Sequence, residues 1–291
     1  MSRSIRFAFL ALFALLVNQS ALAICSPATQ HYIYVGSGPS CQTTSIQTAI
    51  GSIACPDTSI VVSTALGETY AGQNITLDNV SATIVGSTAQ CDAPPVVCDP
   101  EIGCGGGGPP PKIAIGGDGA NPVFYVSGGG YVGFANLSIS GGKGADNSLS
   151  GGGGIGVFGT ATAVTLRNVE LHDNTGGNGG GIAFYGDGSL TLDGTTIQHN
   201  SVTGAGGGLS VDSSAIGHID VTIADDPNLA TDIHDNTATV SGRGISVSGN
   251  VHLLAESDHA LIRNNHAVEF GGGVAVGGCA LADLGLAGHA I

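Results

Sequence analysis

Apolar and polar residues alternate with a period of two along much of the chain, a pattern typical of β-strands. The alternation is clearest in AVTLRNVEL (163–171) and SLTLDGTTI (189–197). Glycine and asparagine residues, which favour turns, separate these short segments. The pattern predicts an all-β protein built from short strands.

A repeated motif organises the alternation. Four segments share an aliphatic residue, two variable residues, an asparagine, a short turn, a Gly-x-Gly and a new apolar alternation. They are LHDNTGGNGGGIAF, IQHNSVTGAGGGLSV, IHDNTATVSGRGISV and IRNNHAVEFGGGVAV. A period of 26 to 36 residues without a helix predicts one coil of a right-handed parallel β-helix, with three strands per coil. Inward stacking is expected for Leu190, Leu192, Ile197, Ile182 and Phe184.

The asparagines of the motif have a structural role in this interpretation. Asparagine tolerates the left-handed backbone of a sharp bend, and its amide can bond to the equivalent asparagine one coil away. A ladder is therefore expected of Asn174, Asn200, Asn236 and Asn265. The Gly-x-Gly supplies the next tight turn, and it is not a phosphate loop because no helix follows it.

The N-terminal segment is predicted to be a signal peptide over 1–23. Arg3 and Arg6 precede an apolar run, and small residues at Ala21 and Ala23 suit a signal peptidase. A single β-helix domain is expected over 24–291, with an N-terminal cap over 24–56 and the clearest repeats over 137–277. Within the cap, 32–36 reads as a strand and 44–55 as an amphipathic helix that covers the open end of the first coil. The segment 58–87 predicts three further strands.

Seven cysteines in an exported chain predict disulfide bonds rather than a metal site, because the chain has no Cys-x-x-Cys pair. Three of them lie in a Cys/Gly/Pro-rich insert over 87–112. We expect one bridge between Cys41 and Cys55 and another within the cluster of Cys91, Cys98 and Cys104. The odd count leaves a thiol unpaired or paired between molecules.

The composition limits the classes of partner that the protein can bind. Only 10% of residues are charged, 50 of 291 are glycine, and the net charge is −15. The acidic balance excludes nucleic acid as a partner, and no segment after the signal predicts a membrane span. We expect a secreted or cell-surface protein, either extracellular or associated with the outer membrane.

Two families share these patterns. IQTAI followed by IVVSTALGETYAGQNITL, within 44–86, is similar to the start of secreted right-handed β-helices of the pectate-lyase-like superfamily. The repeats over 137–277 resemble those of the polymorphic outer membrane protein family, which pair FxxN with GGA[ILV]. Here Leu or Ile replaces Phe, and Gly usually replaces Ala. The resemblance implies a surface-displayed or secreted protein of a kind that is often adhesive, whose partner is an extracellular glycan or a host or cell surface. The regular repeat, the low charge and the lack of a complete catalytic set predict a scaffold without catalysis.

The same resemblance leaves two alternatives open. The first is a truncated autotransporter-type passenger. The second is a polysaccharide lyase or glycoside hydrolase, for which the nearest paired carboxylates are Asp225 and Asp226. Asp187, Asp193 or Asp212 could complete such a cluster. The chain has few Lys and Arg residues with which to bind an acidic polysaccharide. We expect no cofactor, with Ca²⁺ as the alternative.

Residues beside the motif asparagines form a polar stripe in this interpretation. Its members are His172, Asp173, His199, His234 and Asp235. Histidine beside aspartate suits metal binding or acid–base chemistry, and a solvated face is the plainer alternative. Sugar-binding surfaces usually carry exposed aromatic rings, Trp above all, and the chain has no Trp. The aromatics expected near a repeat surface are Tyr131, Tyr185 and Phe270, with core or turn packing as the equal alternative for each.

Overall fold

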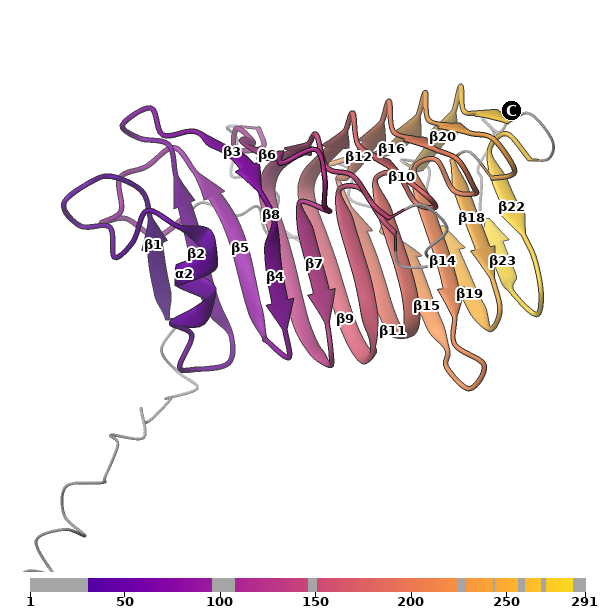
Figure 1. Ribbon diagram of the computed structural model, residues 1–291, viewed down its shortest axis with the longest axis horizontal. Helices are drawn as coiled ribbons and strands as arrows, with labels where there is room; N and C mark the ends of the chain where they lie inside the picture. Colours follow the sequence, from indigo (N-terminus) through magenta and orange to yellow (C-terminus); the bar gives the residue numbers. More distant parts are fainter. Residues whose placement is uncertain are drawn as a thin grey trace, which may run out of the picture.

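A computed structural model describes residues 31–95, 108–145, 151–224, 229–242, 244–255, 260–267 and 271–284. The chain winds into a rod in which parallel strands stack coil upon coil along the long axis (Figure 1). The predicted parallel β-helix is confirmed. The predicted signal peptide lies outside the described residues.

The elements follow one another around the coils. The first part of the rod contains β1 (Tyr32–Val35), α2 (Ile46–Gly51), β2 (Thr58–Ser63), β3 (Tyr70–Gln73), β4 (Ile75–Asp78), β5 (Ala82–Ser87), β6 (Ile113–Gly117), β7 (Phe124–Ser127) and β8 (Gly130–Ser140). The middle contains β9 (Ile155–His172), β10 (Thr175–Gly176), β11 (Ile182–Asp193), β12 (Thr196–Gln198), β13 (Ser201–Val202), β14 (Leu209–Ser213) and β15 (Ile219–Ile223). The last part contains β16 (Thr231–His234), β17 (Thr237–Ala238), β18 (Ile245–Ser248), β19 (Val251–Ala255), β20 (Ala260–Arg263), β21 (His266–Ala267), β22 (Val274–Val276) and β23 (Leu281–Leu284).

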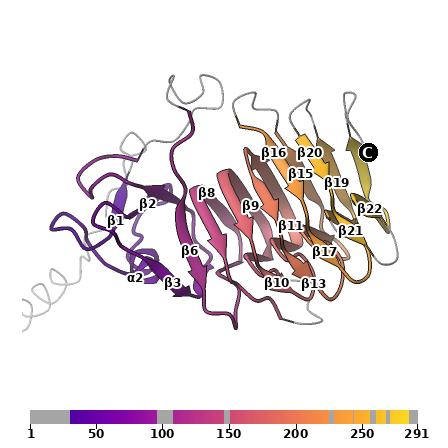
Figure 2. The ribbon, with the colours of Figure 1, turned by 90° about the horizontal axis from the view of Figure 1, so that it is seen from above.

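Two sheets hold the described coils together. Nineteen strands form one sheet that wraps around the rod, and the two-residue strands β10, β13, β17 and β21 form a second sheet of four strands. Figure 2 shows these short strands in a row along one edge. Each repeat therefore contains the three predicted strand segments and a very short fourth one after the asparagine.

The core is a set of columns that run along the rod. Ile182 pairs in register with Ile155 on one side and Leu209 on the other, and Leu209 pairs with Ile245. All five residues expected to point inward are fully buried, namely Ile182, Phe184, Leu190, Leu192 and Ile197. Each such side chain contributes about 1.5–3 kcal/mol by leaving water.

Helix α2 covers the start of the rod (Figure 1). Ser45 caps it by accepting a hydrogen bond from the Thr48 amide at 3.2 Å, and the buried face consists of Ile46, Ala49 and Ile50. The helix is shorter than the predicted 44–55. Between 58 and 87 the structure has four strands instead of three, because one residue without strand structure separates β3 from β4.

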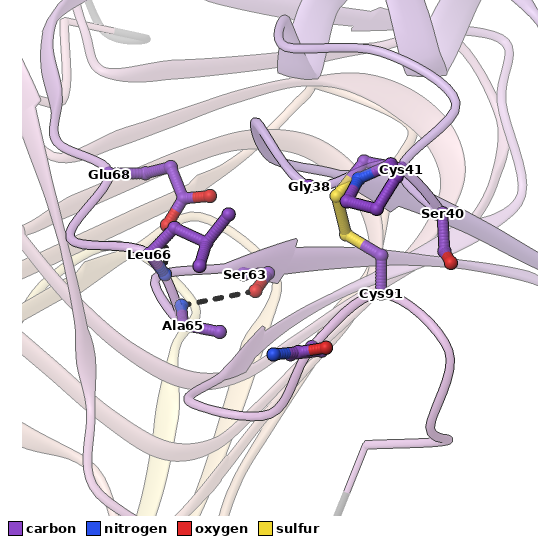
Figure 3. Close-up of a pocket in the computed structure, with 10 residues that line it drawn as sticks. Gly38, Ser40, Cys41, Ser63, Ala65, Leu66, Glu68 and Cys91 are labelled. Atoms are coloured by element: carbon purple, nitrogen blue, oxygen red, sulfur yellow. Dashed lines mark hydrogen bonds between the residues drawn. A yellow bond between two sulfur atoms is a disulfide. The ribbon is translucent and has the colours of Figure 1, made fainter.

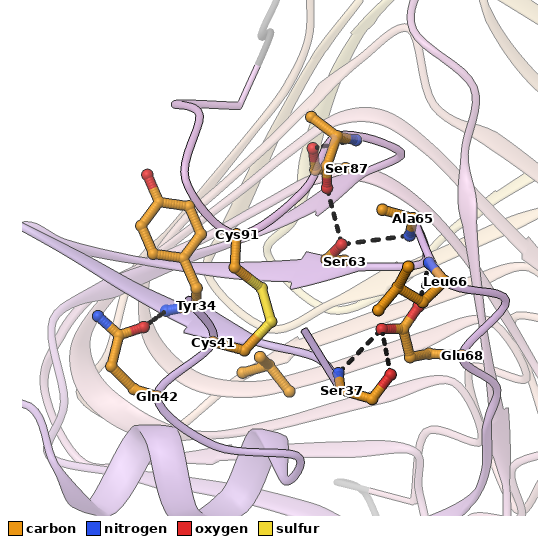
Figure 4. Close-up of a disulfide and its surroundings, with 12 residues drawn as sticks. Tyr34, Ser37, Cys41, Gln42, Ser63, Ala65, Leu66, Glu68, Ser87 and Cys91 are labelled. Atoms are coloured by element: carbon orange, nitrogen blue, oxygen red, sulfur yellow. Dashed lines mark hydrogen bonds between the residues drawn. A yellow bond between two sulfur atoms is a disulfide. The ribbon is translucent and has the colours of Figure 1, made fainter. Parts of the chain in front are cut away.

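The predicted Cys41–Cys55 bridge is wrong, and Cys91 does not pair within its own cluster. Cys41 bonds to Cys91, with their Cα atoms 5.1 Å apart, and so links the loop after β1 to the segment after β5 (Figure 4). Cys55 is disulfide-bonded as well, but not to Cys41. Cys98 and Cys104 lie outside the described residues. Cys279 is a free, exposed thiol.

Candidate functional site

The four motif asparagines lie one above another in the interior. The Nδ2 of Asn174 donates to the Oδ1 of Asn200 at 3.1 Å, and the same bond joins Asn200 to Asn236 and Asn236 to Asn265 at 3.0 Å each. The first three asparagines are completely buried. Their amides therefore serve the fold, because every one of these bonds runs between coils.

The left-handed bend lies one residue earlier than the sequence analysis expects. Asp173, His199, Asp235 and Asn264, which precede the ladder asparagines, have φ angles of 52–53°. The ladder asparagines themselves are not in this conformation. The residue before each asparagine adopts the left-handed backbone, and its side chain is exposed or half-exposed. The side chain of the asparagine therefore points inward. A second bend, at Asn136 and Asn168, is also left-handed, with its own amide-to-amide bond of 2.9 Å.

The polar stripe lies in register on the outer face. Strand pairing aligns Ser140, His172, Gln198, His234 and Arg263 on successive coils. The bend residues Asp173, His199 and Asp235 form the row beside them. All five predicted stripe residues thus lie on one face, although their hydrogen bonds are mostly local.

His172 joins a serine to an aspartate. Its Nε2 is 3.0 Å from Ser138 Oγ, and its Nδ1 is 2.8 Å from Asp173 Oδ2. This order matches the serine–histidine–aspartate arrangement of acyl-transfer enzymes. However, β8 pairs on one side with β6 and on the other with β9, so the sheet uses the backbone amides around Ser138. Amides so engaged cannot stabilise an oxyanion, which that chemistry requires.

His234 lies at the centre of a second polar cluster. Its Nδ1 is 2.7 Å from Asp235 Oδ2, and its Nε2 is 3.7 Å from Asp232 Oδ2. The hydrogen bond with His234 lowers the pKa of Asp235, and the positive charge of Arg263 adds to the effect. Arg263 bonds to Asp232 at 2.6 Å, which raises the pKa of the guanidinium. Both aspartates of this cluster therefore have a partner, Asp232 in Arg263 and Asp235 in His234.

Most of the aspartates expected as catalytic candidates either lie outside the described residues or already have partners within the fold. Asp225 and Asp226 lie outside the described residues, so their geometry is not defined. Asp193 is buried in an ion pair with Arg167 on the neighbouring coil, and Asp187 accepts a hydrogen bond from the His218 amide at 3.0 Å. Among the described residues, no group of three His, Cys, Asp or Glu side chains has an arrangement that could hold a metal ion.

Two aromatic side chains stack on the outer surface of neighbouring coils. Phe158 of β9 and Tyr185 of β11 are in register, with ring centroids 5.5 Å apart and ring planes at 14°. Phe158 is 45% exposed, and both rings line a cavity of about 300 Å³. The sequence pattern identifies Tyr185 as a surface candidate but not Phe158. An aromatic–glycine pair at the same outward position of two coils, Phe158-Gly159 and Tyr185-Gly186, is the signal that could have found it.

The other aromatics expected at the surface do not join this pair. Tyr131 is 41% exposed and pairs in register with Ala163, beyond the bend that follows the Phe158 column. Phe270 lies outside the described residues.

A smaller cavity of about 220 Å³ lies beside the Cys41–Cys91 disulfide (Figure 3). Glu68 lines it, and its Oε1 accepts hydrogen bonds from the Ser37 amide at 2.9 Å and the Ser37 hydroxyl at 2.8 Å. The Leu66 amide donates to its other oxygen at 2.9 Å. These bonds, the Ser37 amide foremost, lower the pKa of Glu68 to about 2. Both carboxylate oxygens are thus engaged in holding two loops together (Figure 4).

No family model, curated protein or solved structure matches the chain. In the parts of the chain that the structure describes, no helix combines the length and apolar character needed to cross a bilayer. Function must therefore be inferred from the arrangement of this chain's own side chains.

Proposed function

We propose that the protein is an exported, non-catalytic β-helix scaffold that acts at the cell surface or outside the cell, where its outer faces bind a glycan or another cell surface. The signal-like segment over 1–23 and the disulfide between Cys41 and Cys91 support export, because disulfides persist in oxidising compartments. The similarity of the repeats to the polymorphic outer membrane protein family supports an adhesive role. The wider home of the fold would be the pectate-lyase-like superfamily.

One observation carries the proposal. Outward residues of successive coils are in register, as in the row from Ser127 through Phe158 and Tyr185 to Asp212. Strands in such a stack are about 4.8 Å apart, and the buried asparagine ladder prevents the rows from shifting. A rigid face with evenly spaced side chains suits a ligand that itself repeats, such as a polysaccharide.

A polysaccharide lyase or glycoside hydrolase is the second candidate. The cluster of His234, Asp232, Asp235 and Arg263 favours it, because it places an imidazole beside two carboxylates on one face. The engagement of both carboxylates by His234 and Arg263 supports the scaffold more strongly. A passenger segment of a larger autotransporter-type protein would have the same binding role.

A combined binding and turnover screen tests the proposal. The purified protein is incubated with a panel of neutral and acidic polysaccharides and with intact cells, with and without added Ca²⁺. We expect binding without release of reducing ends or unsaturated products, and without a requirement for Ca²⁺. Turnover of any polysaccharide would favour the enzyme. Failure to bind every glycan and cell type would contradict the adhesive role.

A further inference from the structure

The stacked pair of Phe158 and Tyr185 lies within an outward row of residues on successive coils. Register places Ser127 and then Asp78 on the Phe158 side, and Asp212 and then Ser248 on the Tyr185 side. The Ser127 hydroxyl donates to Asp78 at 2.8 Å. The row therefore consists of two aromatic rings with a polar or acidic residue on either side.

Glycines form the floor beside the rings. Gly128, Gly159 and Gly186 line the cavity on three successive coils. A Cβ on Gly159 would come within 2.2 Å of the Gly128 carbonyl oxygen, and one on Gly186 within 1.9 Å of the Gly159 carbonyl oxygen. Close backbone approach thus excludes side chains from this strip. The space next to the rings stays open as a consequence.

The rim supplies hydroxyl groups. Ser127, Thr160 and Ser214 line the cavity together with the rings and the glycines. An aromatic floor with a few polar groups is the usual composition of a small-ligand site. Apolar C–H faces and hydroxyl groups are both present on a pyranose ring, which matches this lining.

The charge of this face favours a neutral pyranose over a uronic acid. None of the residues lining the cavity is charged, whereas Asp78 and Asp212 lie in the same row and the whole chain carries −15. A uronic acid would meet repulsion from Asp212 beside Tyr185 and from Asp78 two coils from Phe158. A neutral sugar meets none.

We propose that Phe158 and Tyr185 form a stacking site for a neutral pyranose residue of an extracellular glycan. This inference rests on the proposed binding function and gives it a location and a ligand class. One ring face of the sugar lies against the aromatic pair, and its hydroxyl groups meet Ser127, Thr160 and Ser214 at the rim. The neighbouring coils extend the contact to further sugar residues of the same chain.

Variants of the full chain test the site. Neutral hexasaccharides (cello-, xylo-, manno- and malto-) and a hexagalacturonate serve as probes, and binding is measured by calorimetry and by shifts of the tyrosine ring signals in NMR spectra. We expect at least one neutral probe to bind more tightly than hexagalacturonate. Phe158→Ala and Tyr185→Ala should each weaken binding about three- to tenfold, the usual contribution of an aromatic contact.

Two control variants separate stacking from other effects. Tyr185→Phe retains the ring and should keep most of the affinity. Tyr131→Ala removes an exposed aromatic outside the pair and should leave affinity unchanged. Phe158 is 45% exposed and Tyr185 is partly exposed, so the variants should fold like the parent, which circular dichroism checks.

The outcomes distinguish the site from the wider function. Glycan or cell binding that survives both alanine substitutions overturns the site and leaves the scaffold proposal standing. Preference for hexagalacturonate overturns the assigned ligand class. Absence of binding to every probe and every cell type overturns both.

Discussion

The side-chain amide of Asn200 donates a hydrogen bond to the carbonyl oxygen of the Asn236 side chain at 3.0 Å, although 36 residues of chain separate them. Asn200 also donates to the Leu171 carbonyl at 2.9 Å and accepts two bonds from Asn174. These four hydrogen bonds use only the Nδ2 and Oδ1 atoms of Asn200, which is completely buried. This residue therefore ties together three consecutive coils.

Substitution of Asn200 by alanine should destabilise the protein strongly. The change leaves buried donors and acceptors without partners on two neighbouring coils, and we expect a loss of about 2–4 kcal/mol in the free energy of unfolding. Urea titration followed by circular dichroism measures it. Thr237→Ala, in the exposed row next to the ladder, is the matched control and should change stability by less than about 0.5 kcal/mol. Equal effects of the two variants would show that the ladder adds little.

His199 offers a test of the left-handed bend. Its φ of 53° disfavours a β-branched side chain, so His199→Val should cost about 1–2 kcal/mol. His199→Asn should be neutral or slightly stabilising, because asparagine accepts this conformation. Thermal melting of the two variants gives the comparison. A harmless valine would mean that the bend relaxes to another conformation in solution.

Glu68 should make stability depend on pH in acid. Its pKa in the folded protein is about 2, below the ordinary value of 4.5. A lowered pKa stabilises the folded state above the unfolded value, and this contribution disappears as the pH falls from about 4.5 to about 2. Glu68→Gln should therefore lower stability at pH 7 by about 1 kcal/mol, a figure reduced for solvent screening. The difference from the parent protein should vanish near pH 2; a difference that persists there would contradict the assignment.

The disulfide should stabilise the first coils. Cys41 and Cys91 close a loop of 50 residues, and replacing both by serine should lower the free energy of unfolding by about 2–4 kcal/mol. Hydrogen exchange should speed up first in β1, β2 and β5, the strands nearest to the bridge. Cys279→Ser removes a free, exposed thiol and is the control. Unchanged exchange in the double variant would place the stabilising contacts elsewhere.

The reactivity of Ser138 tests whether Ser138, His172 and Asp173 act as a catalytic group. Although it lies in line with His172 and Asp173, the amides near it are engaged in the sheet, so we expect no labelling by a fluorophosphonate probe. Mass spectrometry of the treated protein measures this. Stoichiometric labelling that Ser138→Ala abolishes, but Ser210→Ala does not, would overturn the non-catalytic proposal.

The fold was predictable from the sequence because its signals are periodic. Alternation placed Ile182 and Phe184 inside, and the motif spacing placed Asn174 and Asn200 one above the other. The bend was misplaced by one residue, because two adjacent polar residues satisfy the same pattern and only the backbone angle distinguishes them. Strand existence and coil stacking were thus accessible without coordinates.

The candidate sites were less accessible because they depend on distances between coils. The partner of Cys41 could not be deduced, since spacing leaves many pairings open. Phe158 can be recognised as part of a candidate site only together with Tyr185, which lies 27 positions later in the sequence. The strand register brings the two rings together. Likewise, nothing in the spacing of Ser37 and Glu68 indicates the hydrogen bonds that join them.

The ladder tolerates coils of unequal length. Successive asparagines are 26, 36 and 29 residues apart, yet their amides stay 3.0–3.1 Å from one another. Part of the additional length of the longest coil lies in the turn between β14 and β15, which is away from the ladder. Doubling the length of a loop costs only about 0.6 kcal/mol. That turn is consequently a natural place to graft a foreign peptide, which the rod would hold at a fixed position along its axis.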